Sequence, residues 1–192
     1  MLDDCDPEVV AESLAPLTML HNGQLCNNPT RVLVPTSRRA EYVDAMVTAV
    51  GSFTVGDPFD PATVIGPVIS ATQRARIEDY IAGARGAGAR ALTGGGRPAG
   101  HERGYYVEPT LFDRVTSEMR IAREEVFRPV AVIIDYDDEE DALRLANDSE
   151  YGLSGNVWFA DEERAISVAR GVRSGNVGTT ETTWTGRCHS AG

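Results

Sequence analysis

Apolar and polar positions alternate along this chain with two periods, and each period predicts one kind of element. Short runs of β-branched and apolar residues between turn residues predict strands, and longer stretches with an apolar residue every three or four positions predict helices. The predicted strands are 31–34, 91–93, 130–136, 153–159 and one starting at 175–177, with extended chain at 105–107. The predicted helices are 7–23, 38–50, 71–87, 138–147 and 161–173.

Start signals support several of these helices. Asp6 precedes a proline at the first helical position, Asp161 precedes the last helix, and Ser70 is followed three residues later by a glutamine, as in a capping box. Ser37 is predicted to cap the second helix. Pro16 lies inside the first helix and is expected to kink or shorten it, because proline lacks the backbone N–H that a helix interior needs.

The order of these elements predicts the fold class. Strands that alternate with helices at this spacing indicate βαβ units. We therefore expect an α/β fold with a mostly parallel, twisted sheet and flanking helices. A length of 192 residues suits one domain or at most two.

Charge and cysteine usage narrow the classes of partner. The formal net charge of −11 disfavours nucleic acid and anionic membranes, because a negative field repels phosphate. No apolar run approaches the roughly 20 residues of a bilayer span, and no signal peptide is evident. The three cysteines are too far apart for a disulfide framework or a zinc pattern, so we expect no metal, free thiols and a cytoplasmic location.

Cys26 is the candidate for chemistry. It follows Gly23 and Gln24 in the stretch "LHNGQLCNN", residues 20–28. Free cysteine is one of the most buried residue types, so Cys26 could be a small core residue. Alternatively, a cysteine on a glycine-permitted turn that Gln24 holds by hydrogen bonds could attack a carbonyl carbon, with its own backbone N–H directed at the developing oxyanion. The residues alone leave both interpretations open.

Six segments give the chain a family resemblance. "NGQLC" with the following "TRVLV" resembles the catalytic-cysteine segment of the aldehyde dehydrogenase superfamily. Five further blocks follow in the same order as in that family: "VGDPFDPATVIGPVIS" at 55–70, "GYYVEPTLF" at 104–112, "IAREEVFRPV" at 121–130, "ANDSEYGLSGNVW" at 146–158 and "SGNVGT" at 174–179. Together they cover most of the chain, and the fold they imply is the catalytic domain of that family.

The resemblance implies roles for three residues. Cys26 would be the nucleophile that oxidises an aldehyde to a carboxylic acid through a thiohemiacetal and a thioester. Glu125 would hydrogen-bond the nicotinamide ribose of NAD or NADP, and Phe127 would pack near the nicotinamide. Without the resemblance, Glu125 would be interpreted as part of a solvated acidic pair and Phe127 as a core residue.

The chain also departs from the family pattern. Members are usually more than twice as long, and their dinucleotide-binding half, general-base glutamate and oxyanion asparagine have no counterpart here. Arg128 replaces a glycine and is expected to place a bulky cation beside the nicotinamide pocket. We expect a partial catalytic domain at 1–179 and a disordered tail at 180–192. Another reading frame could turn Cys188–Gly192 into Val-Pro-Phe-Gly-Gly, so the tail is hypothesised to arise from a frameshift.

Three functional hypotheses follow. The chain could be the catalytic part of an aldehyde dehydrogenase that acts on a small-molecule aldehyde, inactive alone and dependent on a complementing cofactor-binding half, with a homo-oligomer possible. It could instead be an inactive remnant or protein-binding fragment with a reactive thiol. Least favoured is a cofactor-free thiol esterase, because no histidine lies in a motif that would pair with Cys26.

Overall fold

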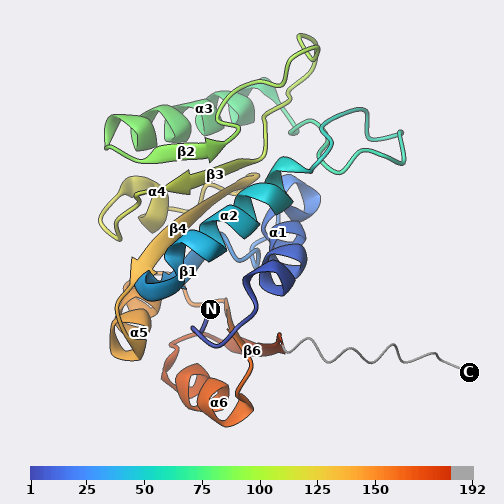
Figure 1. Cartoon of the computed structure of the whole chain (residues 1–192). Helices are drawn as coiled ribbons and strands as arrows, with labels where there is room; N and C mark the ends of the chain where they lie inside the picture. The colour runs from blue at the N-terminus through green and yellow to red at the C-terminus, as the bar shows by residue number, and fades with distance from the viewer. Residues whose placement is uncertain (183–192) are drawn as a thin grey trace, which may run out of the picture.

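The computed structural model describes residues 1–182, and its centre is a sheet of four strands in the order β1-β4-β3-β2 (Figure 1). These strands are β1 (Arg31–Pro35), β2 (Arg90–Thr93), β3 (Thr110–Asp113) and β4 (Val130–Tyr136). β4 pairs in parallel with β1 and β3, and β2 joins β3 in the antiparallel sense. The apolar β4 lies at the centre because both of its faces are covered.

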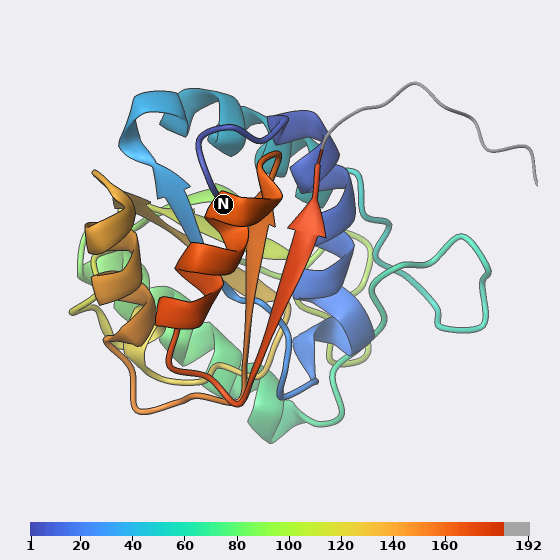
Figure 2. The ribbon, with the colours of Figure 1, turned by 90° about the horizontal axis from the view of Figure 1, so that it is seen from below.

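Helices cover both faces of this sheet, which confirms the predicted α/β class (Figures 1 and 2). Successive side chains of β4 point to opposite faces. Ala131 and Ile133 pack in one core with α1 (Pro7–Gly23) and α2 (Arg39–Gly51). Val132 and Ile134 pack in a second core with α3 (Ala71–Gly86), α4 (Arg120–Arg123) and α5 (Glu139–Asn147).

A second, two-stranded sheet adjoins the first core. β5 (Ser154–Phe159) and β6 (Asn176–Glu181) pair in parallel, and α6 (Glu162–Gly171) connects them as a βαβ unit. The domain boundary proposed at residue 179 falls inside β6, and the buried Thr182 donates its backbone N–H to the Phe159 carbonyl at 2.7 Å. The rest of the proposed tail, including Cys188, lies outside the described residues.

One local prediction is wrong. Ser37 does not cap α2: it lies inside the 3-10 turn η1 (Thr36–Arg38), and α2 begins without a side-chain cap, because Pro35 ends β1 directly before the turn. Residues 105–107, predicted as extended chain, pair with no strand of either sheet, and the Tyr105 carbonyl accepts from the Val68 backbone N–H of the long loop. The short helix α4 was not predicted from the sequence.

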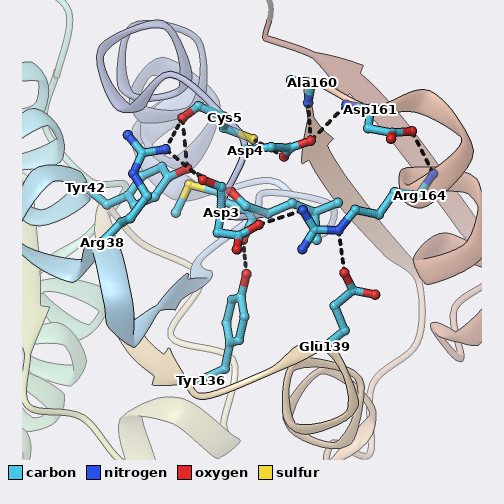
Figure 3. A network of polar contacts seen from close by, with 12 residues as sticks. Asp3, Asp4, Cys5, Arg38, Tyr42, Tyr136, Glu139, Ala160, Asp161 and Arg164 are labelled. Carbon is cyan, nitrogen blue, oxygen red and sulfur yellow. Dashed lines mark hydrogen bonds and ion pairs between the residues drawn. The ribbon is translucent and has the colours of Figure 1, made fainter.

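The first five residues form hydrogen bonds with elements on both sheets (Figure 3). The Asp4 carboxylate accepts from the backbone N–H groups of Ala160 at 3.1 Å and Asp161 at 2.8 Å, just before α6. Arg164 of α6 donates to Asp3 at 2.6 Å and also forms an ion pair with Glu139 of α5. On the side of the central sheet, Tyr42 donates to the Leu2 carbonyl and Tyr136 to the Met1 carbonyl, at 2.8 and 2.6 Å. This segment therefore fixes the position of β5, α6 and β6.

The Met1 amino group makes the stability of this arrangement dependent on pH. It donates to the Leu33 carbonyl at 3.0 Å, and burial lowers its pKa from 8.0 to about 6. Between pH 8 and pH 6 the unfolded chain binds this proton more readily than the folded chain, so acidification favours unfolding. A pKa difference of two units between the unfolded and the folded chain corresponds to about 2.7 kcal/mol of unfolding free energy. Because Met1 is partly exposed to solvent, we expect a smaller loss of about 2 kcal/mol.

Urea unfolding of the 192-residue chain at pH 8 and pH 6 measures this loss. A matched variant with one glycine before Met1 replaces the amine by an amide that does not titrate. In the extended variant, the difference in unfolding free energy between pH 8 and pH 6 should be smaller by about 2 kcal/mol. Equal differences in the two chains would show that the Met1 amine is not responsible.

Candidate functional site

Cys26 lies on an exposed turn between α1 and β1. Its side chain accepts and donates no hydrogen bond within residues 1–182. Cys5, by contrast, is buried beneath the N-terminal segment with 1% of its surface exposed. The interpretation of a small buried cysteine therefore suits Cys5 and is wrong for Cys26.

The turn begins where α1 loses helical geometry. Asp6 caps the start of α1 as predicted, and the helix passes through Pro16 and keeps helical angles to Met19. Leu20 is extended, and the next three residues adopt left-handed φ values of 50°, 58° and 68°. Gly23 is the last of the three, and the chain then turns toward Cys26. Three consecutive left-handed residues reverse the chain sharply, and glycine is the residue that tolerates this conformation best.

Hydrogen bonds hold this turn together and join it to two other segments. Asn22 accepts from the Gly66 backbone N–H at 3.0 Å and donates to the Pro67 carbonyl at 3.1 Å. Asn28 donates to the Leu20 carbonyl at 3.1 Å, and the Ser154 hydroxyl donates to the Asn27 carbonyl at 3.4 Å. Gln24 Nε2 donates to the His21 carbonyl at 3.1 Å, which confirms the prediction that Gln24 holds the turn. Cys26 is exposed, but its backbone is anchored on both sides.

Gly23 brings this turn into contact with the segment that carries the predicted cofactor residues. A β-carbon built at Gly23 would lie 1.9 Å from the Arg128 carbonyl oxygen and 2.6 Å from the Pro129 nitrogen. Only a residue without a side chain allows the two backbones to pack so closely. The sequence blocks around residues 26 and 125, which are far apart in the chain, are therefore neighbours in space.

The two predicted cofactor residues are both exposed on this neighbouring segment. The Glu125 backbone N–H donates to the Tyr151 hydroxyl at 3.3 Å and its carbonyl accepts from Arg76 at 3.3 Å, while its carboxylate accepts no hydrogen bond within residues 1–182. Phe127 has a left-handed φ of 57° and is 37% exposed, so the interpretation of a core phenylalanine is wrong.

The adjacent Glu124 shows the contrast between the two acids of this segment. Its carboxylate accepts from the Tyr80 hydroxyl at 2.7 Å and from Arg120 at 3.1 Å. These hydrogen bonds from Tyr80 and Arg120 lower the pKa of Glu124. Glu124 therefore joins α3 to α4, and Glu125 is the acid that remains available for a ligand.

Arg128, which the sequence predicts beside the nicotinamide pocket, holds its guanidinium carbon 5.7 Å from the centroid of the Phe127 ring. Its residue surface is 3% exposed, and its guanidinium donates to Gln24 Oε1 at 3.4 Å and also to Gln73 Oε1 and the Phe127 carbonyl. Gln73 thus binds Arg128 with its side chain, while its backbone N–H donates to Ser70 Oγ at 3.2 Å as a capping box requires. Sequence reasoning missed this three-residue cluster, because nothing in the linear spacing relates residues 24, 73 and 128.

Other features of residues 1–182 do not add to this site. No group of three or more His, Cys, Asp or Glu side chains in this part of the chain could hold a metal ion. None of its helices combines the length and the hydropathy that a bilayer-spanning segment requires. An open cleft of about 470 Å³ lies elsewhere, between Asp3, the end of β4 and the start of α5, and acidic side chains line much of it.

Comparisons with known proteins identify the family of this chain. The family model described as "Aldehyde dehydrogenase family" matches residues 1–192. The geranial dehydrogenase of Castellaniella defragrans is 46% identical over 178 residues, which are 93% of this chain and 37% of that protein. The 3-succinoylsemialdehyde-pyridine dehydrogenase of a Pseudomonas species is 43% identical over 92% of this chain and 37% of its own length.

Solved structures show the same similarity in three dimensions. The aldehyde dehydrogenase of Mycobacterium tuberculosis complexed with NAD+ has a TM-score of 0.91 and 44% identity, covering 95% of this chain and 38% of that one. An aldehyde dehydrogenase C mutant of Pseudomonas syringae with NAD+ and octanal has a TM-score of 0.91 and 39% identity, covering 96% and 38%. This chain thus spans less than two fifths of the length of these relatives. With its whole length matched by the family model and its fold shared with these enzymes, the chain belongs to the aldehyde dehydrogenase family.

Proposed function

We propose that this chain is the catalytic-domain portion of an NAD(P)-dependent aldehyde dehydrogenase and that Cys26 is its nucleophile. The observation that carries the proposal is the contact at Gly23, which packs the turn that bears the exposed Cys26 against the backbone of Arg128 and Pro129, directly after the exposed Glu125 and Phe127. The candidate nucleophile and the candidate ribose-binding carboxylate therefore lie on two neighbouring segments. The expected location remains the cytoplasm, where the thiol would stay reduced.

The chemistry of Cys26 follows from thiolate reactivity. Its thiolate would form a C–S bond to the aldehyde carbon and leave a thiohemiacetal oxyanion, which the Cys26 backbone N–H would stabilise. Loss of hydride from that carbon gives a thioester, and water then releases the carboxylic acid and regenerates the thiol. Both relatives of solved structure named above were crystallised with NAD+, which accepts the hydride when it is bound.

The residues present fit the nicotinamide end of such a cofactor. The Glu125 carboxylate is exposed and free of protein hydrogen bonds within residues 1–182, so it can accept from both hydroxyls of a ribose. Phe127 offers an exposed aromatic ring two residues away. The family resemblance places the general base and the dinucleotide-binding half outside these residues, so we propose that oxidation requires that half in addition to this chain.

A test that needs only the present chain is acylation by p-nitrophenyl acetate. The thiolate displaces nitrophenolate from the ester carbon, and the acetyl group remains on sulfur. We expect an initial burst of nitrophenolate and an acetyl adduct that peptide mapping places on Cys26, in a background where Cys188→Ser removes the thiol outside the described region. Cys26→Ser should abolish both signals, because an unactivated hydroxyl is a weak nucleophile at neutral pH.

Cys5 provides the internal control. It is buried, and burial raises the pKa of its thiol, so iodoacetamide and the ester should both spare it in the folded chain. Acetylation at Cys5 instead of Cys26, or no acetyl adduct at all, contradicts the proposed nucleophile and favours a non-enzymatic remnant. Continued turnover of the ester would support the esterase alternative, whereas a single burst fits a nucleophile that lacks its general base.

A further inference from the structure

We propose that Arg128 is a positioning residue for the Cys26 turn, acting through Gln24; the inference rests on the proposed role of Cys26. The Arg128 guanidinium is enclosed between the turn and the start of α3. It links Gln24, two residues before Cys26, to Gln73 in the first turn of α3. Three segments that are separate in sequence thereby meet at one side chain.

The first argument is that this arginine is buried without a counter-ion. No carboxylate in residues 1–182 forms an ion pair with it; its partners are two amide oxygens and one backbone carbonyl. Its Nε is buried and has no hydrogen-bond partner in the same part of the chain. Burial lowers the pKa of Arg128, and the nearby Arg76 lowers it further. A guanidinium placed in this way costs stability, so packing energy does not account for its presence.

The contacts of Arg128 also lead to the Cys26 turn through Gln24. Gln24 uses both ends of its amide: Nε2 donates to the His21 carbonyl, and Oε1 accepts from Arg128. Gln24 therefore lies between the end of α1 and a side chain anchored on Gln73. If Arg128 were removed, Gln24 would keep its local contact but lose the one that joins the turn to α3. The Cys26 backbone N–H, which would stabilise the oxyanion, then loses part of its fixed orientation.

Arg128→Met keeps the volume of the side chain but removes its charge and donors. The experiment compares two reactions at Cys26: acylation by p-nitrophenyl acetate, which passes through an oxyanion, and alkylation by iodoacetamide, which does not. The ratio of the two rates cancels changes in thiol exposure. Removal of one oxyanion donor typically lowers the rate by ~10²–10³. Because Arg128→Met displaces this donor without removing it, we expect the ratio to fall by about tenfold or more. Its unfolding midpoint should be unchanged or higher, since the variant buries no unpaired charge.

Gln24→Ala should lower the ratio at least as much, because it also removes the contact with the His21 carbonyl. The double variant should be no worse than Gln24→Ala alone, since Arg128 acts on the turn through Gln24. Arg74→Met is the matched control, because Arg74 lies beside Gln73 on α3 but donates to the Gly104 carbonyl and pairs with Glu78. Its ratio should equal that of the wild type.

The outcomes separate this inference from the function on which it rests. If the wild-type chain gives no acetyl adduct at Cys26, the proposed nucleophile is wrong and the inference is overturned with it. If the wild type is acylated but Arg128→Met leaves the ratio of rates unchanged, the positioning role alone is overturned, whatever happens to the unfolding midpoint. A reduced ratio shared by Arg128→Met and Gln24→Ala, but absent in Arg74→Met, supports it.

Discussion

Gly23→Ala is expected to lower the free energy of unfolding by about 3 kcal/mol or more. A left-handed φ of 68° costs a residue with a β-carbon about 1–2 kcal/mol. The added carbon would also lie 1.9 Å from the Arg128 carbonyl oxygen and 2.1 Å from its carbon, and both belong to the backbone, so no side-chain rotation relieves the overlap. Overpacking of this kind typically costs about 1–3 kcal/mol more.

Urea unfolding measures the change, and Gly83→Ala is the control. Gly83 lies inside α3, and a β-carbon there would meet nothing within 4 Å. Alanine at that position should raise stability by about 0.5–1 kcal/mol, because glycine in a helix interior is entropically unfavourable. Cys26 acylation should also fall in Gly23→Ala under conditions where the chain is still folded. A loss below about 1 kcal/mol would mean that the turn can withdraw from Arg128 at little cost.

Asp113→Asn is expected to cost about 3 kcal/mol at neutral pH. Asp113, at the end of β3, is 2% exposed and forms ion pairs with Arg39 of α2 and Arg90 of β2. Asparagine keeps the shape of the side chain but leaves both guanidinium groups without their buried counter-charge. Breaking a buried ion pair typically costs about 3–5 kcal/mol, and the lower end is expected because water reaches both arginines.

The pH dependence of this loss identifies its cause. Burial alone would raise the pKa of Asp113, but hydrogen bonds from Arg39 and from the Arg114 backbone bring it below 3.8. The carboxylate therefore stabilises the fold fully above the unfolded pKa of 3.8, and this stabilisation is lost as the pH falls through the folded pKa. At pH values below the folded pKa of Asp113, the wild type and Asp113→Asn should therefore have similar free energies of unfolding.

Asp79→Asn is the corresponding surface control. Asp79 pairs with Arg120 at 2.9 Å, but its side chain is 67% exposed. Its substitution should change stability by less than about 0.5 kcal/mol, because exposed ion pairs contribute little. Equal losses for Asp79→Asn and Asp113→Asn would mean that burial does not set the strength of the Asp113 interaction.

Elements with strong local signals could be predicted from the chain alone. β4 was predicted with its observed bounds, since a seven-residue run of mainly β-branched and apolar residues has no other stable placement than a buried strand. The caps at Asp6, Ser70 and Asp161 were also predicted, because each side chain binds backbone N–H groups only two or three residues away. Family resemblance, through motifs in register over most of the chain, supplied Cys26, Glu125 and Phe127 as candidates.

Which of these residues meet depends on contacts between distant segments, which the sequence does not show. Glu124 pairs with Tyr80 and Arg120, whereas the carboxylate of the adjacent, identical Glu125 accepts no hydrogen bond from residues 1–182. Arg128 is enclosed between Gln24 and Gln73, two residues that the linear sequence does not relate to it. Local propensity is set by neighbours within a few positions, whereas burial and charge pairing depend on contacts between distant segments, such as the approach of Gly23 to Arg128, that form only when the whole sheet is assembled.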